Sequence, residues 1–323
     1  MRILYLPYTV LFSILFVVIL PAFWIYTRIT GRYSGHFSER LGLVPDHVLK
    51  RISGHPRIWI HAVSLGEVKV AAAIINALNR IRPDWTILVS TTTESGRDMA
   101  RETFGTVIPV IYAPIDFIGS VHKALSCIRP DVMVVLETEL WPTWLRQAHR
   151  MGIKTVLING RISLKSINGY LRFRFFFREV LKNFDAFSMI MKGDADRIES
   201  MGADLEKIRI NGNAIYDLLA SLADPAREAE IRTALNLRAE ERVFVAGSTR
   251  GGEEAMVLDA YGKILEKYPD TVLMIAPRHI ERVPEIGGMI ESRGFGYQLR
   301  TDFNDGKKIR KKQIVIINTF CEL

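Results

Sequence analysis

An acidic residue at the start of a predicted helix is the first candidate for chemistry in this chain. The apolar run at residues 57–60 predicts a short strand, which leads through a Ser-Leu-Gly turn to a helix that begins near Glu67. In open α/β sheets, ligands bind at the carboxyl ends of the strands, where this acid falls. The helix dipole favours an ionised carboxylate, so Glu67 is expected to stay ionised and to be able to act as a base. An acid in a first helical turn also serves merely to complement the dipole, and the local pattern leaves both interpretations open.

Polar residues follow other predicted strands of the first half. They form the segments 91–96 (TTTESG), 137–142 (ETELWP) and 159–163 (NGRIS). Taken singly, the threonine-rich run is typical of a helix cap, and Glu137 and Glu139 are equally explained as surface or cap acids. The carboxyl ends of parallel strands meet at one edge of a sheet, so together the segments favour a binding site there.

Two loops in the second half carry groups suited to a phosphate. Residues 247–254 (GSTRGGEE) follow a predicted strand and open a helix, which offers backbone N–H groups and Arg250 to an anion. Residues 277–282 (PRHIER) follow the next strand and add Arg278 and His279. The glycine-rich loop lacks the GKS/T ending of a Walker loop, and alone it is a weak signal. The chain has neither a GxGxxG after the first strand nor a GxSxG elbow, so no hydride cofactor and no serine hydrolase is indicated.

The composition limits the classes of partner that we expect this protein to bind. The 323 residues suffice for about two domains, and the net charge of +8 suggests a polyanionic partner such as nucleic acid, anionic lipid or a nucleotide-linked substrate. The positive charge is spread along the chain, so part of it is solvated surface. Cys127 and Cys321 have no partner pattern, and the seven histidines show no metal-ligand spacing. We therefore expect a reducing compartment, no metal site and no cofactor.

The N-terminal segment predicts a membrane anchor. Residues 3–26 contain no charged side chain, and about 20 apolar residues are enough to cross the hydrocarbon core. Basic residues then follow at Arg28, Arg32 and Arg40, so the positive-inside rule places everything after residue 30 in the cytoplasm. A cleaved signal peptide and a buried core helix fit less well. The two prolines of the segment leave a helix lying in one leaflet as an alternative to a spanning one.

Short apolar strands alternate with helical segments through the body, which predicts parallel sheets covered on both faces. Strands are expected at 58–63, 86–90, 107–112, 132–136, 155–158, 186–190, 243–246, 271–276 and 313–317, and helices at 70–80, 96–104, 118–128, 141–151, 227–236, 253–268 and 284–293. We therefore expect an α/β chain with one Rossmann-like domain at about residues 55–215, a linker near 216–226 and a second Rossmann-like domain after it. A cleft between two such halves is the usual ligand site.

Residues 172–182 (RFRFFFREVLK) mix basic and aromatic side chains. Such a pattern is typical of a membrane interface or of a nucleic-acid surface, and also of an ordinary helix with one packed and one solvated face. The predicted anchor favours a membrane over nucleic acid as the partner.

The motifs together resemble the family of 3-deoxy-D-manno-octulosonic acid (Kdo) transferases. The segments that carry the resemblance are ERLG (39–42), HAVSLGE (61–67), STTTESG (90–96), LETELWP (136–142), NGRIS (159–163), GN (212–213), STRGGEE (248–254) and PRHIER (277–282). SLGE together with ETELWP is the specific pair. The resemblance implies a glycosyltransferase-B fold without a metal requirement, and transfer of Kdo from CMP-Kdo to a lipid A precursor at the cytoplasmic face of the inner membrane.

The resemblance also implies roles for single residues. Glu67 is expected to be the general base that deprotonates the acceptor hydroxyl. The acceptor site is expected to comprise Ser64, Gly66, Thr92, Glu137, Glu139 and Arg161, and the donor site Ser248, Arg250, Glu253, Arg278 and His279.

The chain departs from the family pattern at its end. Family members continue for about another hundred residues, and Asn318 and Cys321 replace an Asp and a Gly of the family pattern. We therefore expect an anchor at residues 1–30, an acceptor domain at 31–220 and a partial donor domain at 221–323, in a truncated member. Another nucleotide-sugar glycosyltransferase and a non-catalytic membrane-associated binding module remain the alternatives.

Overall fold

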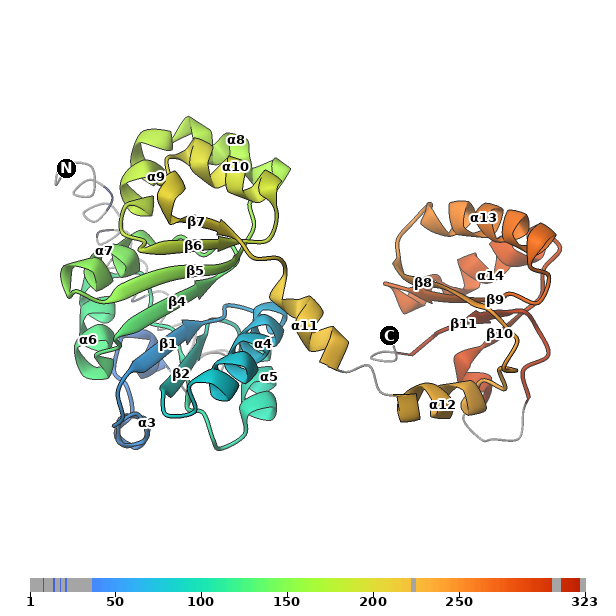
Figure 1. The fold of residues 1–323 in the computed structure, drawn as a ribbon, viewed down its shortest axis with the longest axis horizontal. Helices are drawn as coiled ribbons and strands as arrows, with labels where there is room; N and C mark the ends of the chain where they lie inside the picture. The colour runs from blue at the N-terminus through green and yellow to red at the C-terminus, as the bar shows by residue number, and fades with distance from the viewer. Residues whose placement is uncertain are drawn as a thin grey trace. The chain divides into compact units, whose positions relative to one another are not determined.

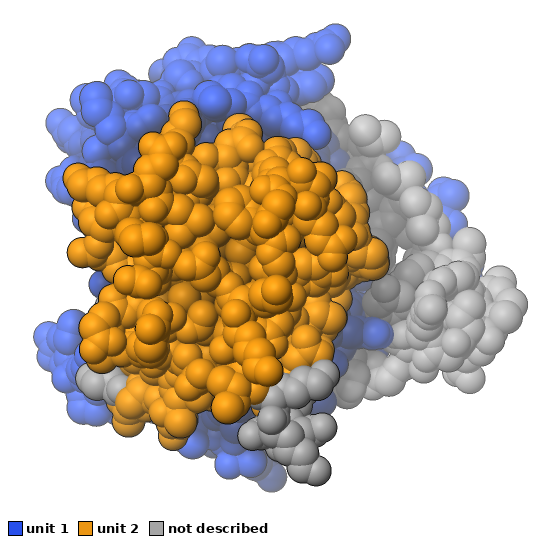
Figure 2. Space-filling view, turned by 90° about the vertical axis from the view of Figure 1, so that its right-hand side faces the viewer, with its two compact units in different colours: residues 1–222 blue, residues 223–323 orange. Residues whose placement is uncertain are grey.

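The computed structural model describes residues 37–221, 225–303 and 309–319, together with Tyr8, Ile14, Val18 and Pro21. The chain divides into two compact units, residues 1–222 and residues 223–323, which are coloured separately in Figure 2. Apart from those four positions, the anchor predicted at residues 1–30 lies outside the described residues. No helix within the described residues is long and apolar enough to cross a membrane.

Unit 1, residues 1–222, is built around a seven-stranded sheet in which every strand pair is parallel. Its strands are β1 (Arg57–His61), β2 (Thr86–Thr91), β3 (Val110–Tyr112), β4 (Val132–Leu136), β5 (Lys154–Gly160), β6 (Ala186–Met189) and β7 (Ile208–Ile210). Its helices are α2 (Phe37–Arg40), α3 (Asp46–Arg51), α4 (Leu65–Ile81), α5 (Glu94–Phe104), α6 (Ile118–Ile128), α7 (Pro142–Arg150), α8 (Leu164–Arg172), α9 (Arg174–Leu181), α10 (Lys192–Met201), the short 3-10 helix η2 (Leu205–Lys207) and α11 (Ala214–Ser221).

Helices cover both faces of this sheet (Figure 1), and apolar side chains pack between the helices and the strands. Because neighbouring residues of a strand point to opposite faces, Ile58 and Ile60 of β1 pack with α4 and α5, while Trp59 packs with α6 and α7. Trp59 and Trp144 are fully buried against each other, with ring centroids 5.0 Å apart. The near-continuous apolar strands that the sequence shows are thus those of a parallel sheet buried on both sides.

Unit 2, residues 223–323, holds a four-stranded parallel sheet in the order β10-β11-β9-β8. Its elements are α12 (Pro225–Ala234), β8 (Val243–Thr249), α13 (Glu253–Lys267), β9 (Val272–Pro277), η3 (Ile280–Arg282), α14 (Val283–Ser292), β10 (Tyr297–Leu299), η4 (Arg300–Phe303) and β11 (Ile314–Ile316). Helices α13 and α14 pack on one face of β9 and β11, while Leu235 and Phe303 pack on the other. The α/β class with parallel sheets is therefore confirmed in both units.

Several local expectations need correction. The strand expected from residue 107 begins at Val110. Residues 172–182, for which the sequence left a membrane interface, a nucleic-acid surface and an ordinary helix open, span the end of α8 and the whole of α9, which are separated at Phe173. The stretch expected as a linker near 216–226 contains most of α11, whose Ala214 and Ile215 pack on the core beneath α4. Strands β7 and β10 and helix α10 were not expected, because their sequences contain no long apolar run.

Candidate active site

The strand order of unit 1 places Glu67 at the point where ligands usually bind. The order β3-β2-β1-β4-β5-β6-β7 runs toward lower numbers up to β1 and toward higher numbers from β4, so the topological switch lies between β1 and β4. Glu67 follows β1, and Glu137 and Glu139 follow β4. Ligands of open parallel sheets bind in the crevice outside the carboxyl ends of the strands at this switch.

Glu67 is the third residue of α4, and its side chain turns back toward the strand it follows. The N–H of Val63 donates to Oε2 of Glu67 over 2.9 Å, and Oγ of Ser64 donates to Oε1 over 3.3 Å. Ser64 is the N-cap residue of α4, but its side chain accepts no hydrogen bond from the helix; the acid instead satisfies a backbone donor outside the helix, the N–H of Val63. Only 7% of Glu67 is exposed.

Burial changes the protonation that the sequence predicted for Glu67. Burial raises the pKa of Glu67 from 4.5 to about 7, because desolvation outweighs the hydrogen bond from Val63. The charges of Glu139 and Glu137 raise the pKa of Glu67 further. The expectation of a fully ionised Glu67 is therefore wrong, because desolvation and two like charges outweigh the helix dipole. A carboxyl group with a pKa near neutrality can both accept and release a proton at pH 7.

The two acids after β4 are held by specific contacts. Glu137 has a left-handed backbone, with φ of 55°, in which a residue other than glycine is strained. Its Oε2 lies 2.7 Å from Nη2 of Arg161, which follows β5. Glu139 accepts a hydrogen bond from Nε1 of Trp141 over 2.6 Å, and burial raises the pKa of Glu139. The structure thus brings three predicted site residues, Glu67, Glu137 and Glu139, within electrostatic reach of one another.

The remaining predicted acceptor residues surround the same turn or extend from it. The N–H of Thr92 donates to the carbonyl of Val63 over 3.2 Å, which joins the loop after β2 to the turn that carries Glu67. Gly66 is exposed, and a Cβ atom built on it meets no atom within 4 Å. Its lack of a side chain is therefore not required by packing and leaves the approach to Glu67 open.

Asp116 was missed by the sequence argument and lies beside the acids. It is 2% exposed and lines a cavity of about 320 Å³ together with Tyr8, Glu139 and Trp141. Its carboxylate accepts hydrogen bonds from the Tyr8 hydroxyl (2.8 Å) and from the N–H of Trp144 (3.0 Å) in the first turn of α7. Burial raises the pKa of Asp116 to about 6. Asp116 lies 26 residues before α7, the helix whose first turn it contacts, so no local sequence pattern indicated this role.

The predicted donor residues of unit 2 lie at the carboxyl ends of two adjacent strands. Ser248, Arg250, Arg278 and His279 are all exposed. The N–H of Arg278 donates to the carbonyl of Thr249 over 3.0 Å, which brings the two loops together. Ser248 has a left-handed backbone with φ of 56°. Within the described residues, the guanidinium groups of Arg250 and Arg278 have no ion-pair partner, whereas Nδ1 of His279 lies 3.4 Å from Glu281.

Two acids of the segment 247–254, which follows β8, are engaged within unit 2 itself. Glu253 accepts a hydrogen bond from the N–H of Arg250 over 2.8 Å, so its carboxylate caps the loop. Glu254 is fully buried and forms two hydrogen bonds with Arg282, of 2.7 and 3.1 Å. Burial opposes ionisation of Glu254, but the contacts with Arg282 lower its pKa overall. Of the basic residues in the segment 277–282, Arg282 is structural and Arg278 is available for a ligand.

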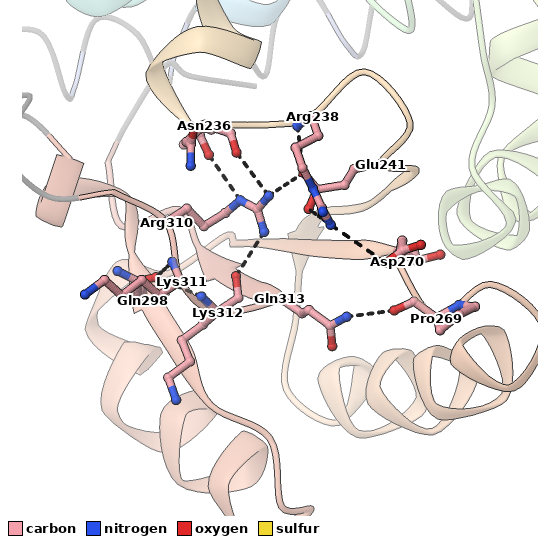
Figure 3. A network of polar contacts seen from close by, with 12 residues as sticks. Asn236, Arg238, Glu241, Pro269, Asp270, Gln298, Arg310, Lys311, Lys312 and Gln313 are labelled. Atoms are coloured by element: carbon pink, nitrogen blue, oxygen red, sulfur yellow. Dashed lines mark hydrogen bonds and ion pairs between the residues drawn. The ribbon is translucent and has the colours of Figure 1, made fainter.

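A second basic cluster of unit 2 lies at the opposite, amino-terminal ends of the strands (Figure 3). Arg310, shortly before β11, pairs with Glu241 and donates to the carbonyls of Leu235 and Asn236. Gln313 donates to the carbonyl of Pro269 over 2.7 Å. These contacts tie the segments that precede β8, β9 and β11 together, so part of the net positive charge is structural.

Comparison with known proteins identifies the family. A family model described as 3-deoxy-D-manno-octulosonic-acid transferase (kdotransferase) matches residues 35–218. This chain belongs to the Kdo transferase family. The match covers the whole described sheet of unit 1, including Glu67 and the loops after β4 and β5.

Individual relatives extend beyond that region. A bifunctional glycosyltransferase/methyltransferase of Fusobacterium nucleatum is 32% identical over 263 residues, which are 81% of this chain and 40% of that protein. The 3-deoxy-D-manno-octulosonic acid transferase of Haemophilus influenzae is 28% identical over 270 residues, which are 84% of this chain and 62% of that protein. This Kdo transferase family member therefore spans between 40% and 62% of the length of these two relatives.

Solved structures support the fold. The UDP-GlcNAc 2-epimerase of Neisseria meningitidis aligns with a TM-score of 0.57 at 15% identity, over 81% of this chain and 71% of that one. A glycosyltransferase from Rickettsia africae aligns with a TM-score of 0.50 at 12% identity, over 82% of this chain and 68% of that one. These likenesses support the glycosyltransferase-B fold class. In the part of the chain that the structure describes, no group of three or more His, Cys, Asp or Glu side chains is arranged to hold a metal ion.

Proposed function

We propose that this protein is an inverting glycosyltransferase that moves Kdo from CMP-Kdo to a lipid A precursor, with Glu67 as the general base. The observation that carries the proposal is a buried carboxyl group with a pKa of about 7 at the topological switch of the sheet. Membership in the Kdo transferase family supports the sugar and the reaction class.

The proposed reaction requires Glu67 to accept one proton. The acceptor hydroxyl oxygen forms a bond to the anomeric carbon of Kdo while the bond from that carbon to the phosphate oxygen breaks. CMP leaves with the electron pair of that bond, and the hydroxyl proton passes to Glu67. Because Val63 and Ser64 hold both carboxylate oxygens, the base is already oriented before the acceptor arrives.

The leaving phosphate needs positive charge, and unit 2 offers it. Arg250 and Arg278 are exposed cations on adjacent strand ends, and no carboxylate among the described residues neutralises them. A guanidinium group suits a phosphate because it can donate two parallel hydrogen bonds. We assign these two residues, with Ser248 and His279 beside them, to the CMP moiety. We assign Glu253 to the donor site as well, where its carboxylate also caps the loop by accepting from the N–H of Arg250.

The direct test is release of CMP from CMP-Kdo in the presence of the tetraacylated lipid A precursor. Glu67→Gln should reduce the rate by a factor of about 10² to 10⁴, which is the usual contribution of a general base. Glu102→Gln is the matched control, because Glu102 is an exposed acid of the neighbouring helix α5 and lies outside the segment 91–96. Full activity of Glu67→Gln would remove the base assignment, and no CMP release by the unmodified protein would remove the transferase proposal.

The proposed location at the cytoplasmic face of the inner membrane has support in helices α8 and α9. Leu164 (77% exposed), Phe173 (52%) and Phe175 (60%) present apolar side chains to solvent beside the exposed Lys165, Arg172 and Arg174. Phe176 and Phe177 of the same segment pack on the core, so only part of the aromatic run is structural. Apolar side chains framed by cations suit the surface of an anionic bilayer.

Co-sedimentation with vesicles tests this surface. Phe173→Ser with Phe175→Ser should weaken binding to phosphatidylglycerol vesicles severalfold, and Val107→Ser is the control because Val107 is 84% exposed far along the chain from α8 and α9. Equal binding by the double variant and the control would exclude α8 and α9 as the membrane surface.

A further inference from the structure

The segment 39–42 (ERLG) has no role in the proposal so far, although it is one of the segments that carry the family resemblance. It comprises the last residues of α2 and the turn that follows. Glu39 accepts a hydrogen bond from the N–H of Tyr112 at the end of β3 (2.7 Å) and pairs with Arg97 of α5 (2.9 Å). The segment is therefore attached to the carboxyl end of β3 and to α5.

The backbone of the same segment is fixed at two further points. The carbonyl of Arg40 accepts a hydrogen bond from the N–H of Ile115 over 2.9 Å. Gly42 has a left-handed backbone with φ of 84°, and a Cβ atom built there would overlap the carbonyl oxygen of Ser120 in α6. Only glycine permits so close an approach. The side chain of Arg40 thus leaves the backbone from a point that the surrounding fold holds in place.

Arg40 directs its guanidinium group to the loop after β2. Its Nη2 donates to the carbonyl of Thr92 over 2.8 Å, and its guanidinium carbon lies 4.2 Å from the centroid of the Tyr112 ring. The guanidinium carbon of Arg97 lies at the same distance from that ring. A planar guanidinium group over an aromatic ring has few alternative orientations, so the donor that reaches Thr92 is restrained.

Backbone hydrogen bonds continue from this loop to the proposed base. The peptide group between Thr92 and Thr93 accepts from Arg40 through its carbonyl and donates to the carbonyl of Val63 through its N–H, over 3.2 Å. The N–H of Val63 in turn donates to Oε2 of Glu67 over 2.9 Å. Three hydrogen bonds in series therefore connect Arg40 with Glu67. A charged donor at one end of such a series strengthens the bonds that follow it, because each bond polarises the next.

We propose that Arg40 is a positioning residue that orients the Glu67 carboxylate through the loop after β2 and the backbone of Val63. This inference rests on the proposed function, because it concerns the base of that reaction. The charged groups that act on the pKa of Glu67 are Glu139 and Glu137, which follow β4, so Arg40 acts through the connecting backbone rather than by its charge. A small displacement of a reacting group lowers the rate, which is how the fixed loop supports catalysis.

The pKa of Glu67 tests this connection without any turnover. An NMR titration of the full chain, with ¹³C-labelled glutamate side chains, follows the carboxyl group whose signal Glu67→Gln removes. The hydrogen bond from Val63 lowers the pKa of Glu67. Arg40→Gln should loosen that bond and therefore raise this pKa above its value in the unmodified protein. Arg40→Lys retains a donor for the carbonyl of Thr92 and should leave the pKa nearly unchanged.

The CMP-release assay tests the consequence for the reaction. Arg40→Gln should lower kcat by about tenfold and leave the KM for CMP-Kdo unchanged, because the base is misplaced while the donor site is intact. The acidic limb of its pH profile should move to higher pH, since a raised pKa leaves less of the base ionised. Arg40→Lys should recover most of the loss in kcat.

Two further variants separate positioning from folding. Arg40→Met keeps an apolar stem over Tyr112 but has no donor, so it should reproduce the changes of Arg40→Gln. Arg51→Gln is the matched control, because Arg51 of α3 also donates to a backbone carbonyl, that of Thr106 beyond the end of α5. It should leave both the pKa of Glu67 and kcat unchanged. All variants are compared at a temperature at which circular dichroism shows them folded.

The two proposals can fail separately. An unchanged pKa of Glu67 with an unchanged acidic limb in Arg40→Gln and Arg40→Met would overturn the positioning role, and CMP release by the unmodified protein would then still support the transferase. Equal losses of kcat in Arg40→Gln and Arg40→Lys would overturn it as well. A raised pKa in Arg40→Gln, without CMP release by the unmodified protein, would refute the transferase but keep the connection between Arg40 and Glu67.

Discussion

The two units place charge at their strand ends in opposite ways. In unit 1 the acids are withdrawn from water and held by neighbours: Glu67 is 7% exposed, and Glu139 is bonded to Trp141. In unit 2 the candidate cations Arg250 and Arg278 are exposed, and no ion-pair partner is found for them in the described part of unit 2. Both units nevertheless carry a left-handed residue other than glycine near a strand end: Glu137 lies directly after β4 in unit 1, and Ser248 lies among the last residues of β8 in unit 2.

This difference indicates what each unit contributes before a ligand binds. Burial tunes the carboxyl groups of unit 1 in the protein alone, so their chemistry is prepared by folding. Arg250 and Arg278 have no ion-pair partner among the described residues of unit 2, so under the proposed function their contribution is expected only when the donor binds. Removing a charge from unit 1 should therefore change stability, and removing one from the donor loops of unit 2 should change affinity.

The largest effect is expected where a buried ion pair of unit 1 loses one partner. Arg97 is 4% exposed and forms hydrogen bonds of 2.9 and 3.1 Å with Glu39, which is 6% exposed and also accepts from the N–H of Tyr112. Arg97→Met removes the buried charge that pairs with Glu39 and should lower the free energy of unfolding by about 3 to 5 kcal/mol. Arg101→Gln, an exposed arginine on the same helix, should change it by less than about 0.5 kcal/mol. Urea denaturation measures the free energy of unfolding of both variants. Similar losses in Arg97→Met and Arg101→Gln would contradict the expected difference between a buried and an exposed arginine.

The next largest effect is a pH dependence of stability that belongs to Glu67. Its pKa is 4.5 ordinarily and about 7 in the folded protein, so the folded state holds a proton that the unfolded state has released between those values. Stability from this group is therefore greatest below pH 4.5 and falls as pH rises to about 7, by about 3 kcal/mol at roughly 1.4 kcal/mol per pH unit. Asp116 titrates in an overlapping range, so the measurement is the difference between the unmodified protein and Glu67→Gln. A difference that stays constant between pH 4.5 and 7.5 would rule out the raised pKa of Glu67.

A smaller effect, on affinity alone, is expected from a donor-loop cation of unit 2. Arg278→Ala should raise the Kd for CMP about ten- to a hundredfold, because a hydrogen bond to a charged group is worth about 1.5 to 3 kcal/mol. Its stability should remain within about 0.5 kcal/mol of the unmodified protein, since the side chain is exposed. Lys263→Ala, an exposed cation on α13, provides the control for net charge. Loss of stability without loss of CMP affinity would place Arg278 with the structural arginines instead.

The elements around the acid site could be predicted from sequence because their signals are local. Strand β1 is an apolar run, and the turn before Glu67 combines a capping serine with a glycine. The parallel α/β pattern predicts only that the strand ends converge at one edge of the sheet. It does not predict that β1 and β4 are adjacent, which is what makes Glu67 and Glu137 neighbours. The structure adds the specific strand order and hence the switch point.

The remaining features depend on packing that no local pattern encodes. Strand β7 has only three residues with Arg209 at its centre, and its pairing with β6 decides its conformation. Arg161 and Arg197 line one cavity of about 680 Å³, although 36 residues separate them in the chain. They meet there because Arg161 follows β5, Arg197 lies on the helix after β6, and these two strands are adjacent. Glu67 was predicted to stay ionised because the helix dipole can be read from the sequence, whereas the desolvation that raises its pKa depends on the finished fold.

The smallest effect tests whether the open approach to Glu67 is functional. Gly66 lies inside α4, and an added Cβ atom meets nothing within 4 Å, so Gly66→Ala should raise the free energy of unfolding by roughly 0.4 to 1 kcal/mol through reduced freedom of the unfolded chain. Gly96→Ala is the matched variant at the start of α5, where the Cβ atom comes within 2.8 Å of Oγ1 of Thr93 and 3.2 Å of the carbonyl of Val63. That crowding should cancel the gain or reverse it. If the acceptor passes over Gly66, the stabilised Gly66→Ala protein should also show a higher KM for the acceptor and an unchanged KM for CMP-Kdo. A Gly66→Ala variant that is more stable and equally active would show that the acceptor does not need the open surface at Gly66.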